Sequence, residues 1–175
     1  IEADYLDELQ LGSSEEAEVR QLMARWESKV IFTFTGNVGE AQDFPSVLQG
    51  LKKCGRLKDI VFLVIGDGRY KTELIKSIQS EGLDNTVFCL GQYPMQYMPL
   101  FYYYSAYLIV PLRDTAIFSY TLPGKVQSYM SSGKPIVGMV NGEAAQVIVE
   151  AGCGYAVASG DHDGFAGILD LCCSL

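Results

Sequence analysis

Residues 120–143 read YTLPGKVQSYMSSGKPIVGMVNGE, and this stretch predicts a helix, a short buried strand and a turn into a second helix. Pro123 and Gly124 open the first helix, because Pro is favoured in a first helical turn. Gly133 lies just past its last turn, where glycine is favoured, and an apolar strand follows at 136–137. A helix, strand and helix in such close succession indicate layered α/β structure.

Lys125 is the one basic residue of this first helix, and it lies in the first turn. The backbone N–H groups and the dipole of a helix N-terminus already attract anions, whereas cations are normally favoured at the other end. Lys125 therefore suits a bound phosphate better than it suits helix stability. The alternative is a solvated lysine near a helix start.

The same alternation extends in both directions along the chain. Apolar strands are predicted at 30–34, 60–65, 87–90, 107–110, 136–137 and 155–157. Helices are predicted at 13–26, 44–53, between Gly68 and Gly82, at 94–104, 124–133 and 143–150, and from 161. Uniformly apolar strands that alternate with helices predict a doubly wound, mainly parallel, six-stranded Rossmann-like α/β sheet with helices on both faces. Within the helix after the second strand, Leu74, Ile75 and Ile78 are expected on the buried face.

Residues 1–12 have no strong periodicity and are interpreted as a linker, so that 13–175 forms one domain. The chain breaks off in mid-pattern after Leu169, which suggests a piece of a longer, two-domain protein.

Composition excludes several classes of function. A net charge of −8 argues against a nucleic-acid or anionic-membrane binder. An odd count of five cysteines without a Cys-x-x-Cys pair argues against disulfides or zinc and favours a reducing cytoplasm. We see no signal peptide and no apolar run near the roughly 18 residues of a membrane helix. His162, the only histidine, is expected in a surface helix turn, so neither a metal cluster nor a Ser–His pair is predicted.

Short glycine-rich turns follow the first three strands, at 36–39, 66–68 and 91–92. Because ligands bind at the carboxyl ends of parallel strands, these turns are expected to rim a single crevice together with Lys125. They match neither the Gly-x-Gly-x-x-Gly fingerprint nor a P-loop. For the first turn the alternative is a plain tight turn, and for the second it is Asp67 acting as a helix N-cap.

Tyrosines are unusually dense from Tyr93 to Tyr107. Half of them are expected in the core, and the rest could form an apolar surface that meets a partner domain or a membrane interface.

At this point several motifs fall in order and at a familiar spacing. They read TGNVGEAQ at 35–42, IGDGR at 65–69, LGQ at 90–92, LPGK at 122–125, SGKPIV at 132–137, GE at 142–143 and AGCG at 151–154. Together they resemble the C-terminal, donor-binding half of retaining GT-B glycosyltransferases of family four. The resemblance covers nearly the whole chain from Lys29 to about Leu169 and is greatest to the branch that makes bacterial capsule, O-antigen and colanic-acid polysaccharides.

The resemblance implies a domain that binds a nucleotide-diphosphate sugar, UDP-linked in our reading, for transfer to a saccharide that could be lipid-linked. Gly36 and Asn37 would approach the diphosphate or sugar, Arg69 and Lys125 would offset phosphate charge, and Gln92 would lie near the base. The implied donor site comprises Gly36, Asn37, Gly39, Gly66, Asp67, Gly68, Arg69, Gln92, Pro123, Gly124, Lys125, Ser128 and Glu143.

The resemblance further implies that no metal and no cofactor is needed. Catalytic groups are expected in a missing N-terminal acceptor domain, so the isolated chain would bind nucleotide without turnover. The location would be cytoplasmic, at the inner face of the membrane where a lipid-linked acceptor is used.

Departures from the family pattern leave the donor open. Tyr120 and Ser128 occupy the positions of two usual glutamates, and Asn37 and Gln42 stand where Arg and Lys are usual. These changes fit the polysaccharide branch, but they could also indicate altered or lost activity. Two other hypotheses remain: half of a sugar-nucleotide 2-epimerase, against which the late, lone His162 argues, and a non-enzymatic protein-interaction module.

Overall fold

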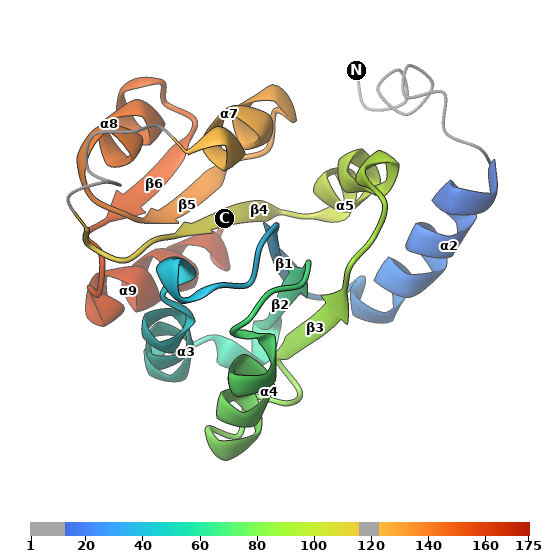
Figure 1. Cartoon of the computed structure of the whole chain (residues 1–175), viewed down its shortest axis with the longest axis horizontal. Coiled ribbons are helices and arrows are strands. Elements are labelled where there is room, and N and C mark those ends of the chain that lie inside the picture. Colours follow the sequence, from blue (N-terminus) through green and yellow to red (C-terminus); the bar gives the residue numbers. More distant parts are fainter. Residues whose placement is uncertain (1–12, 116–122) are drawn as a thin grey trace.

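The computed structural model describes residues 13–115 and 123–175. The interpretation of 1–12 as a linker, and Tyr120 with its expected role, therefore lie outside the described residues. The helices are α2 (Ser13–Met23), α3 (Phe44–Lys53), α4 (Lys71–Ser80), α5 (Met98–Tyr104), α7 (Gly124–Ser131), α8 (Gly142–Glu150) and α9 (His162–Cys172). The strands are β1 (Val30–Thr35), β2 (Ile60–Ile65), β3 (Val87–Gly91), β4 (Tyr107–Pro111), β5 (Ile136–Met139) and β6 (Gly154–Val157) (Figure 1).

The strands form one six-stranded sheet in the order β3-β2-β1-β4-β5-β6, and every pair is parallel. The predicted doubly wound parallel sheet is thus confirmed. The order reverses between β1 and β4, which pair only at Phe32↔Tyr107 and Thr33↔Leu108. The two strands therefore separate toward their carboxyl ends, where sheets of this topology bind ligands.

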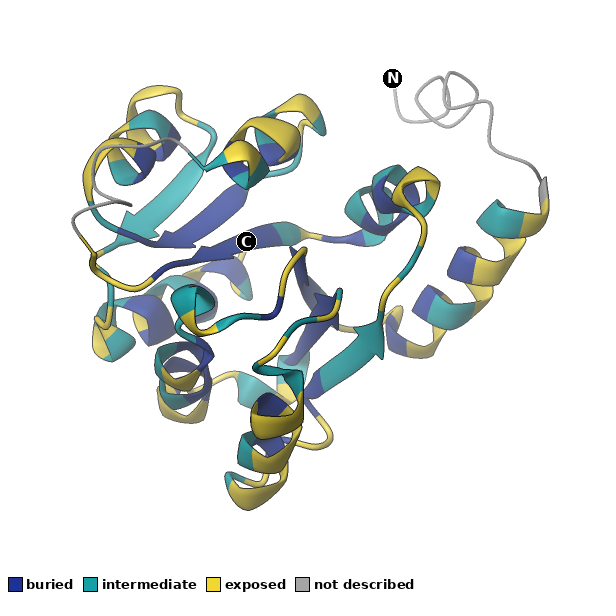
Figure 2. Ribbon diagram, in the orientation of Figure 1, coloured by how far each residue is buried: buried dark blue, intermediate teal, exposed yellow. Residues whose placement is uncertain are grey.

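Successive side chains of a strand point to opposite faces of the sheet, so apolar strands need helices on both faces. On β1, Phe32 and Phe34 face the cluster formed with α3, α4 and α9, while Ile31 faces the cluster formed with α2 and α5. Helices α7 and α8 cover the second face over β4 and β5. Figure 2 shows that the central strands are buried and that the outer surfaces of the helices carry the exposed residues.

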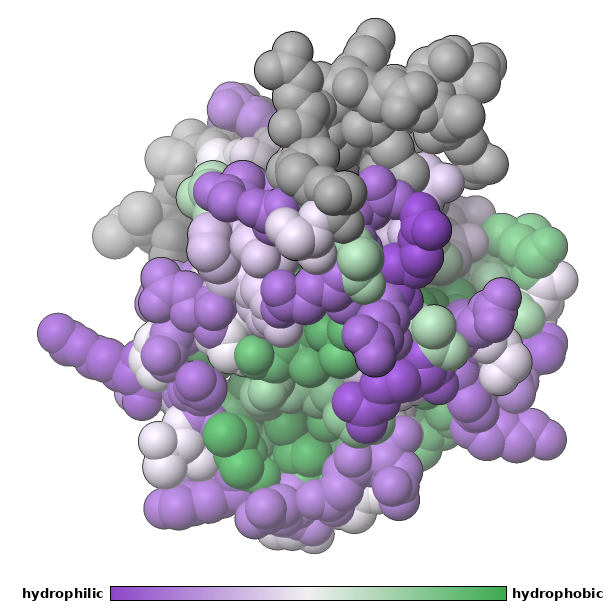
Figure 3. Space-filling view, turned by 90° about the vertical axis from the view of Figure 1, so that its right-hand side faces the viewer, coloured by the Kyte–Doolittle hydropathy of each residue, from purple (hydrophilic) through white to green (hydrophobic). Residues whose placement is uncertain are grey.

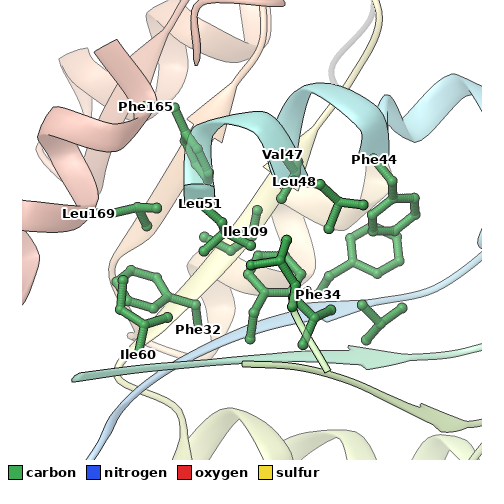
Figure 4. Close-up of a cluster of buried hydrophobic side chains, with 14 of the residues drawn as sticks. Phe32, Phe34, Phe44, Val47, Leu48, Leu51, Ile60, Ile109, Phe165 and Leu169 are labelled. Atoms are coloured by element: carbon green, nitrogen blue, oxygen red, sulfur yellow. The ribbon is translucent and has the colours of Figure 1, made fainter. Parts of the chain in front are cut away.

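The largest cluster lies between the sheet and the pair α3 and α9 (Figure 4). Val47, Leu48 and Leu51 of α3 are buried, as their spacing predicts. The two helices pack very closely, because a Cβ added at Gly50 of α3 would lie 2.6 Å from the ring of Phe165 on α9.

One core prediction is wrong. Leu74 and Ile78 of α4 are buried, but Ile75 is 38 % exposed. Leu74 and Ile78 are one helical turn apart, and α4 turns only that narrow stripe toward the end of the sheet near β3. Ile75 lies outside the stripe.

The tyrosine-rich segment around α5 also differs from the expectation, because each tyrosine from Tyr93 to Tyr107 is half-buried and none is fully buried. Two of the hydroxyl groups bond to α2. The Tyr97 hydroxyl donates to Glu18 at 3.2 Å, and Arg20 donates to the Tyr104 hydroxyl at 3.2 Å. The segment thus fastens α2 to α5.

The sheet ends at β3, its edge strand on the side of α2 and α4. Seen from this side, an apolar area is bordered by hydrophilic residues (Figure 3). Phe88 and Leu90 of β3 are half-buried and pack against the cluster with α2 and α5. No helix in the described parts of the chain is long and apolar enough to span a membrane.

Asp170 of α9 holds the turn that follows α3, and this contact yields a stability prediction. Its carboxylate accepts bonds from the Cys54 thiol at 3.0 Å and from the backbone N–H groups of Gly55 at 3.2 Å and Arg56 at 2.9 Å. The bond from Cys54 lowers the pKa of Asp170. Asp170→Ala should reduce the free energy of unfolding by about 1–3 kcal/mol, because these donors lose their acceptor.

Urea denaturation measures this change. Asp163→Ala on the same helix is the control, because the Asp163 side chain is 84 % exposed and pairs only at the surface with Lys53. Equal midpoints for the two variants would show that Asp170 does not hold the turn.

Candidate functional site

The glycine turns after β1, β2 and β3 lie side by side. The Gly36 N–H donates to the Ile65 carbonyl at 2.9 Å, and the Gly66 N–H donates to the Gly91 carbonyl at 2.7 Å. Gly66 has φ +143°, and a Cβ added there would lie 1.8 Å from the Gly36 carbonyl oxygen. The predicted convergence of the three turns is confirmed, and its closeness requires glycine at 66.

Backbone bonds also join the first two turns further from the sheet. The Val38 N–H donates to the Asp67 carbonyl at 2.8 Å, and the Tyr70 N–H donates to the Val38 carbonyl at 3.0 Å. A Cβ added at Gly68 would lie 2.2 Å from the Val38 carbonyl oxygen. The two turns therefore form one bonded unit rather than two separate loops.

A hollow of about 350 Å³ opens beside these turns. Its lining includes five residues that the sequence assigned to the site, namely Gly36, Asn37, Gly66, Asp67 and Gln92. The others are apolar or aromatic residues that the sequence reading did not assign, namely Ile65, Tyr93, Met95 and Met98. Ile65 ends the second strand, and Tyr93, Met95 and Met98 belong to the segment between the third strand and the helix that follows it. The hollow thus has a polar glycine-rich side and an apolar side.

Lys125, in the first turn of α7, lies against the β1 turn. A Cβ added at Gly36 would be 3.4 Å from Lys125 Cε and 3.5 Å from Lys125 Nζ. The ammonium group lies 3.6 Å from the ring centroid of Phe34, a cation–π contact. Burial lowers the pKa of Lys125 to about 7 from its ordinary value of 10.5. The alternative of a freely solvated lysine is therefore wrong.

No carboxylate pairs with Lys125 among residues 13–115 and 123–175. A half-buried cation without a counter-charge, beside a glycine turn and at a helix N-terminus, is a favourable place for an anion.

Tyr129 explains why α7 lies at this place. Its fully buried hydroxyl accepts a bond from the Thr35 N–H at 2.8 Å and lies 3.2 Å from Thr35 Oγ1. Thr35 directly precedes Gly36. Helix α7 is thus bonded to the end of β1, in the gap that opens between β1 and β4.

Asp67 does not cap a helix, so that alternative is wrong as well. Helix α4 begins at Lys71, and its N-cap residue is Tyr70. Asp67 Oδ1 accepts from the Gly68 N–H at 2.8 Å and lies 3.6 Å from Lys71 Nζ. Lys71 Nζ would in turn be 4.0 Å from a Cβ at Gly91, so Lys71 stands beside the third turn.

Other residues assigned by resemblance do not line the hollow. Arg69 is exposed, and the Gly39 N–H donates to Gln42 Oε1 at 3.0 Å. Ser128 is exposed, and its hydroxyl donates to the Gly124 carbonyl at 3.2 Å. Glu143 is exposed in the first turn of α8.

Pro123 is the N-cap residue of α7. Gly124 begins the helix, and a Cβ added there would meet nothing within 4 Å. His162 begins α9, as predicted, and does not line the hollow. Among the residues that the structure describes, no three His, Cys, Asp or Glu side chains gather in a metal-binding group. Independence from metal and cofactor stays a prediction.

Comparison with known proteins places this geometry in context. The family profile described as "Glycosyl transferases group 1" matches residues 29–172. No curated protein sequence matches the chain significantly.

Solved structures share the fold. Anabaena Alr3699/HepE, in a complex with UDP and glucose, superposes with a TM-score of 0.73 at 20 % identity, over 93 % of this chain and 43 % of that one. WaaG, a glycosyltransferase of lipopolysaccharide biosynthesis, gives a TM-score of 0.74 at 13 % identity, over 95 % and 44 %. The C-terminal domain of the group 1 protein LpcC from Francisella tularensis gives 0.67 at 16 % identity, over 94 % and 84 %.

The chain thus spans less than half the length of HepE and WaaG, but most of the separate LpcC domain. Because the family profile covers most of its residues, the chain belongs to the group 1 glycosyl transferases.

Proposed function

We propose that this chain is the donor-binding domain of a retaining glycosyltransferase of family four, in the branch that makes bacterial capsule, O-antigen or colanic-acid polysaccharide. Its donor is a UDP-linked hexose or N-acetylhexosamine, and its acceptor is a saccharide, lipid-linked at the cytoplasmic face of the inner membrane. An N-terminal acceptor domain supplies the catalytic groups. Two proteins of similar structure, HepE in its complex with UDP and a glycosyltransferase of lipopolysaccharide biosynthesis, support this proposal.

The position of Lys125 is the observation that carries the proposal. Lys125 lies in the first turn of α7, against the Gly36 turn, and no carboxylate of the described residues pairs with it. A diphosphate placed there receives the ammonium group and the free N–H groups of the helix. Gly36 and Gly66 carry no side chain that would keep the diphosphate from the backbone.

Lys125 does not line the hollow but lies beside it at Gly36, and the hollow itself fits a nucleoside. Tyr93, Met95 and Met98 give it an apolar side on which a flat base can pack, and Gln92 offers an amide that can donate and accept hydrogen bonds. The base would then lie near β3 and the diphosphate between β1 and α7.

We further propose that this arrangement supports sugar transfer without a metal. When the bond between the sugar and the diphosphate breaks, negative charge grows on the diphosphate oxygen. Lys125 and the N-terminus of α7 would stabilise this charge more strongly in the transition state than in the ground state. Turnover would need the acceptor domain, so this chain alone would bind the donor without hydrolysing it.

Isothermal titration calorimetry with UDP, UMP and uridine tests the proposal. UDP should bind most tightly and uridine most weakly, because each phosphate removed loses charge-assisted contacts worth about 1–3 kcal/mol. The absence of heat with UDP, UDP-sugars and GDP-sugars alike would count against the proposal.

A further inference from the structure

Within the described part of the chain, the Tyr129 hydroxyl bonds to a single residue, Thr35. It accepts from the Thr35 N–H at 2.8 Å, lies 3.2 Å from Thr35 Oγ1, and can donate toward the Thr35 carbonyl oxygen at 3.4 Å. The side chain is fully buried. A phenylalanine would fill the same space, so the hydroxyl has a role that packing alone does not explain.

The Tyr129 hydroxyl takes the place of a hydrogen bond between β1 and β4. Strands β1 and β4 pair only through Phe32 and Thr33, and then they separate. The N–H of Thr35, beyond the last pair, bonds to Tyr129 instead of to β4. Tyr129 therefore completes the hydrogen bonding of β1 at the point where the site begins.

A second tyrosine fixes the ring of the first. Tyr102 of α5 meets Tyr129 edge to face, with 5.5 Å between the ring centroids, and its hydroxyl lies 3.2 Å from Thr35 Oγ1. Thr35, Tyr102 and Tyr129 thus join β1, α5 and α7 in one hydrogen-bonded group. Such a group allows little rotation of α7 about its own axis.

Tyr129 and Lys125 are four residues apart on α7 and so share one face of the helix. One contacts Thr35 and the other Gly36, two consecutive residues at the end of β1. We propose that the Tyr129 hydroxyl is a positioning group for donor binding: by bonding α7 to Thr35 it holds the Lys125 ammonium over Gly36, where the diphosphate binds. This inference rests on the proposed function of the site.

A double-mutant cycle tests the inference, with UDP as the probe and calorimetry as the measurement. Tyr129→Phe should weaken UDP binding by about tenfold, because Lys125 is no longer held in place. In a Lys125→Met background the same change should have little further effect, because there is no ammonium group left to position. A role in stability alone would lower the melting temperature without this coupling.

Ser105→Ala is the matched control. Ser105 is also buried. Its hydroxyl donates to Thr33 Oγ1, on the strand β1 that also carries Thr35, and to the Phe101 carbonyl, both at 2.6 Å. Its loss should lower the melting temperature but leave UDP affinity within about twofold. The ¹³Cε resonance of Lys125 gives a spectroscopic readout: UDP should shift it in the wild type and in Ser105→Ala, and much less in Tyr129→Phe.

Should Tyr129→Phe fail to fold, Thr35→Val is the second variant. It removes the Thr35 hydroxyl that faces Tyr129 but keeps the bond from the Thr35 N–H, so a smaller loss of UDP affinity, about two- to threefold, is expected. Unchanged UDP affinity in the variant, or an equal loss with and without Lys125, would overturn the inference. A wild-type chain that does not bind UDP would instead count against the proposed function.

Discussion

Replacing Lys125 with methionine is expected to raise the melting temperature of the free domain by several degrees and to weaken UDP binding ten- to a hundredfold. Stability should rise because burial penalises an ammonium group that has no carboxylate partner in the described residues. UDP binding should weaken because the same ammonium group would contact the diphosphate. Methionine keeps a flexible side chain of similar length and a sulfur that packs well against the Phe34 ring. A net stabilisation of about 1–3 kcal/mol is reasonable, since each unit of pKa shift corresponds to about 1.4 kcal/mol.

The sign of the pH dependence follows from the same shift. The pKa of Lys125 is about 7 in the folded domain and 10.5 ordinarily. Between these values the unfolded chain binds more protons than the folded one, so this group makes stability rise with pH. The stability advantage of Lys125→Met over the wild type should therefore be largest at and below pH 7 and should shrink toward pH 10.5.

Ligand binding has the opposite dependence. A diphosphate stabilises the charged ammonium group, so binding takes up a proton, and UDP affinity should fall as pH rises above about 7. Lys125→Met should lose this dependence. Differential scanning fluorimetry and calorimetry across this pH range measure both effects.

Lys76→Met is the control, because the Lys76 side chain is 69 % exposed on α4 and lies 4.0 Å from Glu73. It should change neither the melting temperature nor UDP affinity appreciably. A Lys125→Met variant that is destabilised and binds UDP normally would refute the phosphate-binding role.

Gly66→Ala should be the most disruptive single substitution in the site. The added Cβ would lie 1.8 Å from the Gly36 carbonyl oxygen, a backbone atom that cannot move without breaking the bonded turns. The φ of +143° is itself unfavourable for alanine. We expect a loss of at least about 3 kcal/mol in the free energy of unfolding, and no measurable UDP binding in any protein that remains folded.

Gly82→Ala is a control that has the backbone strain of a positive φ but not the steric clash of Gly66→Ala. Gly82 also has a positive φ, +70°, but a Cβ added there meets nothing within 4 Å. Its substitution should cost about 1 kcal/mol and leave UDP affinity unchanged. Similar urea midpoints for the two variants would show that the turns do not pack as closely as the structure indicates.

The fold could be predicted almost entirely from the sequence, because its signals are local. Apolar runs such as 60–65 mark strands buried on both faces, and glycine or proline marks the ends of helices such as α7. The parallel arrangement then follows from the alternation of these elements. Ile75 shows the limit: which residues of a helix are covered depends on how far the sheet extends beneath it.

The site could be predicted only in outline. Strand-end rules bring Gly36, Gly66 and Lys125 to one edge. They do not show that the Lys125 ammonium rests on Phe34, nor that Tyr129 bonds to Thr35, because both contacts join residues about ninety positions apart through tertiary packing.

The most direct test of this account is a UDP titration followed by backbone amide NMR. The account predicts that UDP shifts the amides of Gly36, Asn37, Gly66 and Lys125, around the hollow beside β1 and the start of α7. A separate hollow of about 420 Å³ lies between the ends of α7 and α8, lined in part by Gly133, Gly152 and Cys153, and serves as an internal comparison. Shifts concentrated there, with the amides of Gly36, Gly66 and Lys125 unmoved, would contradict the account.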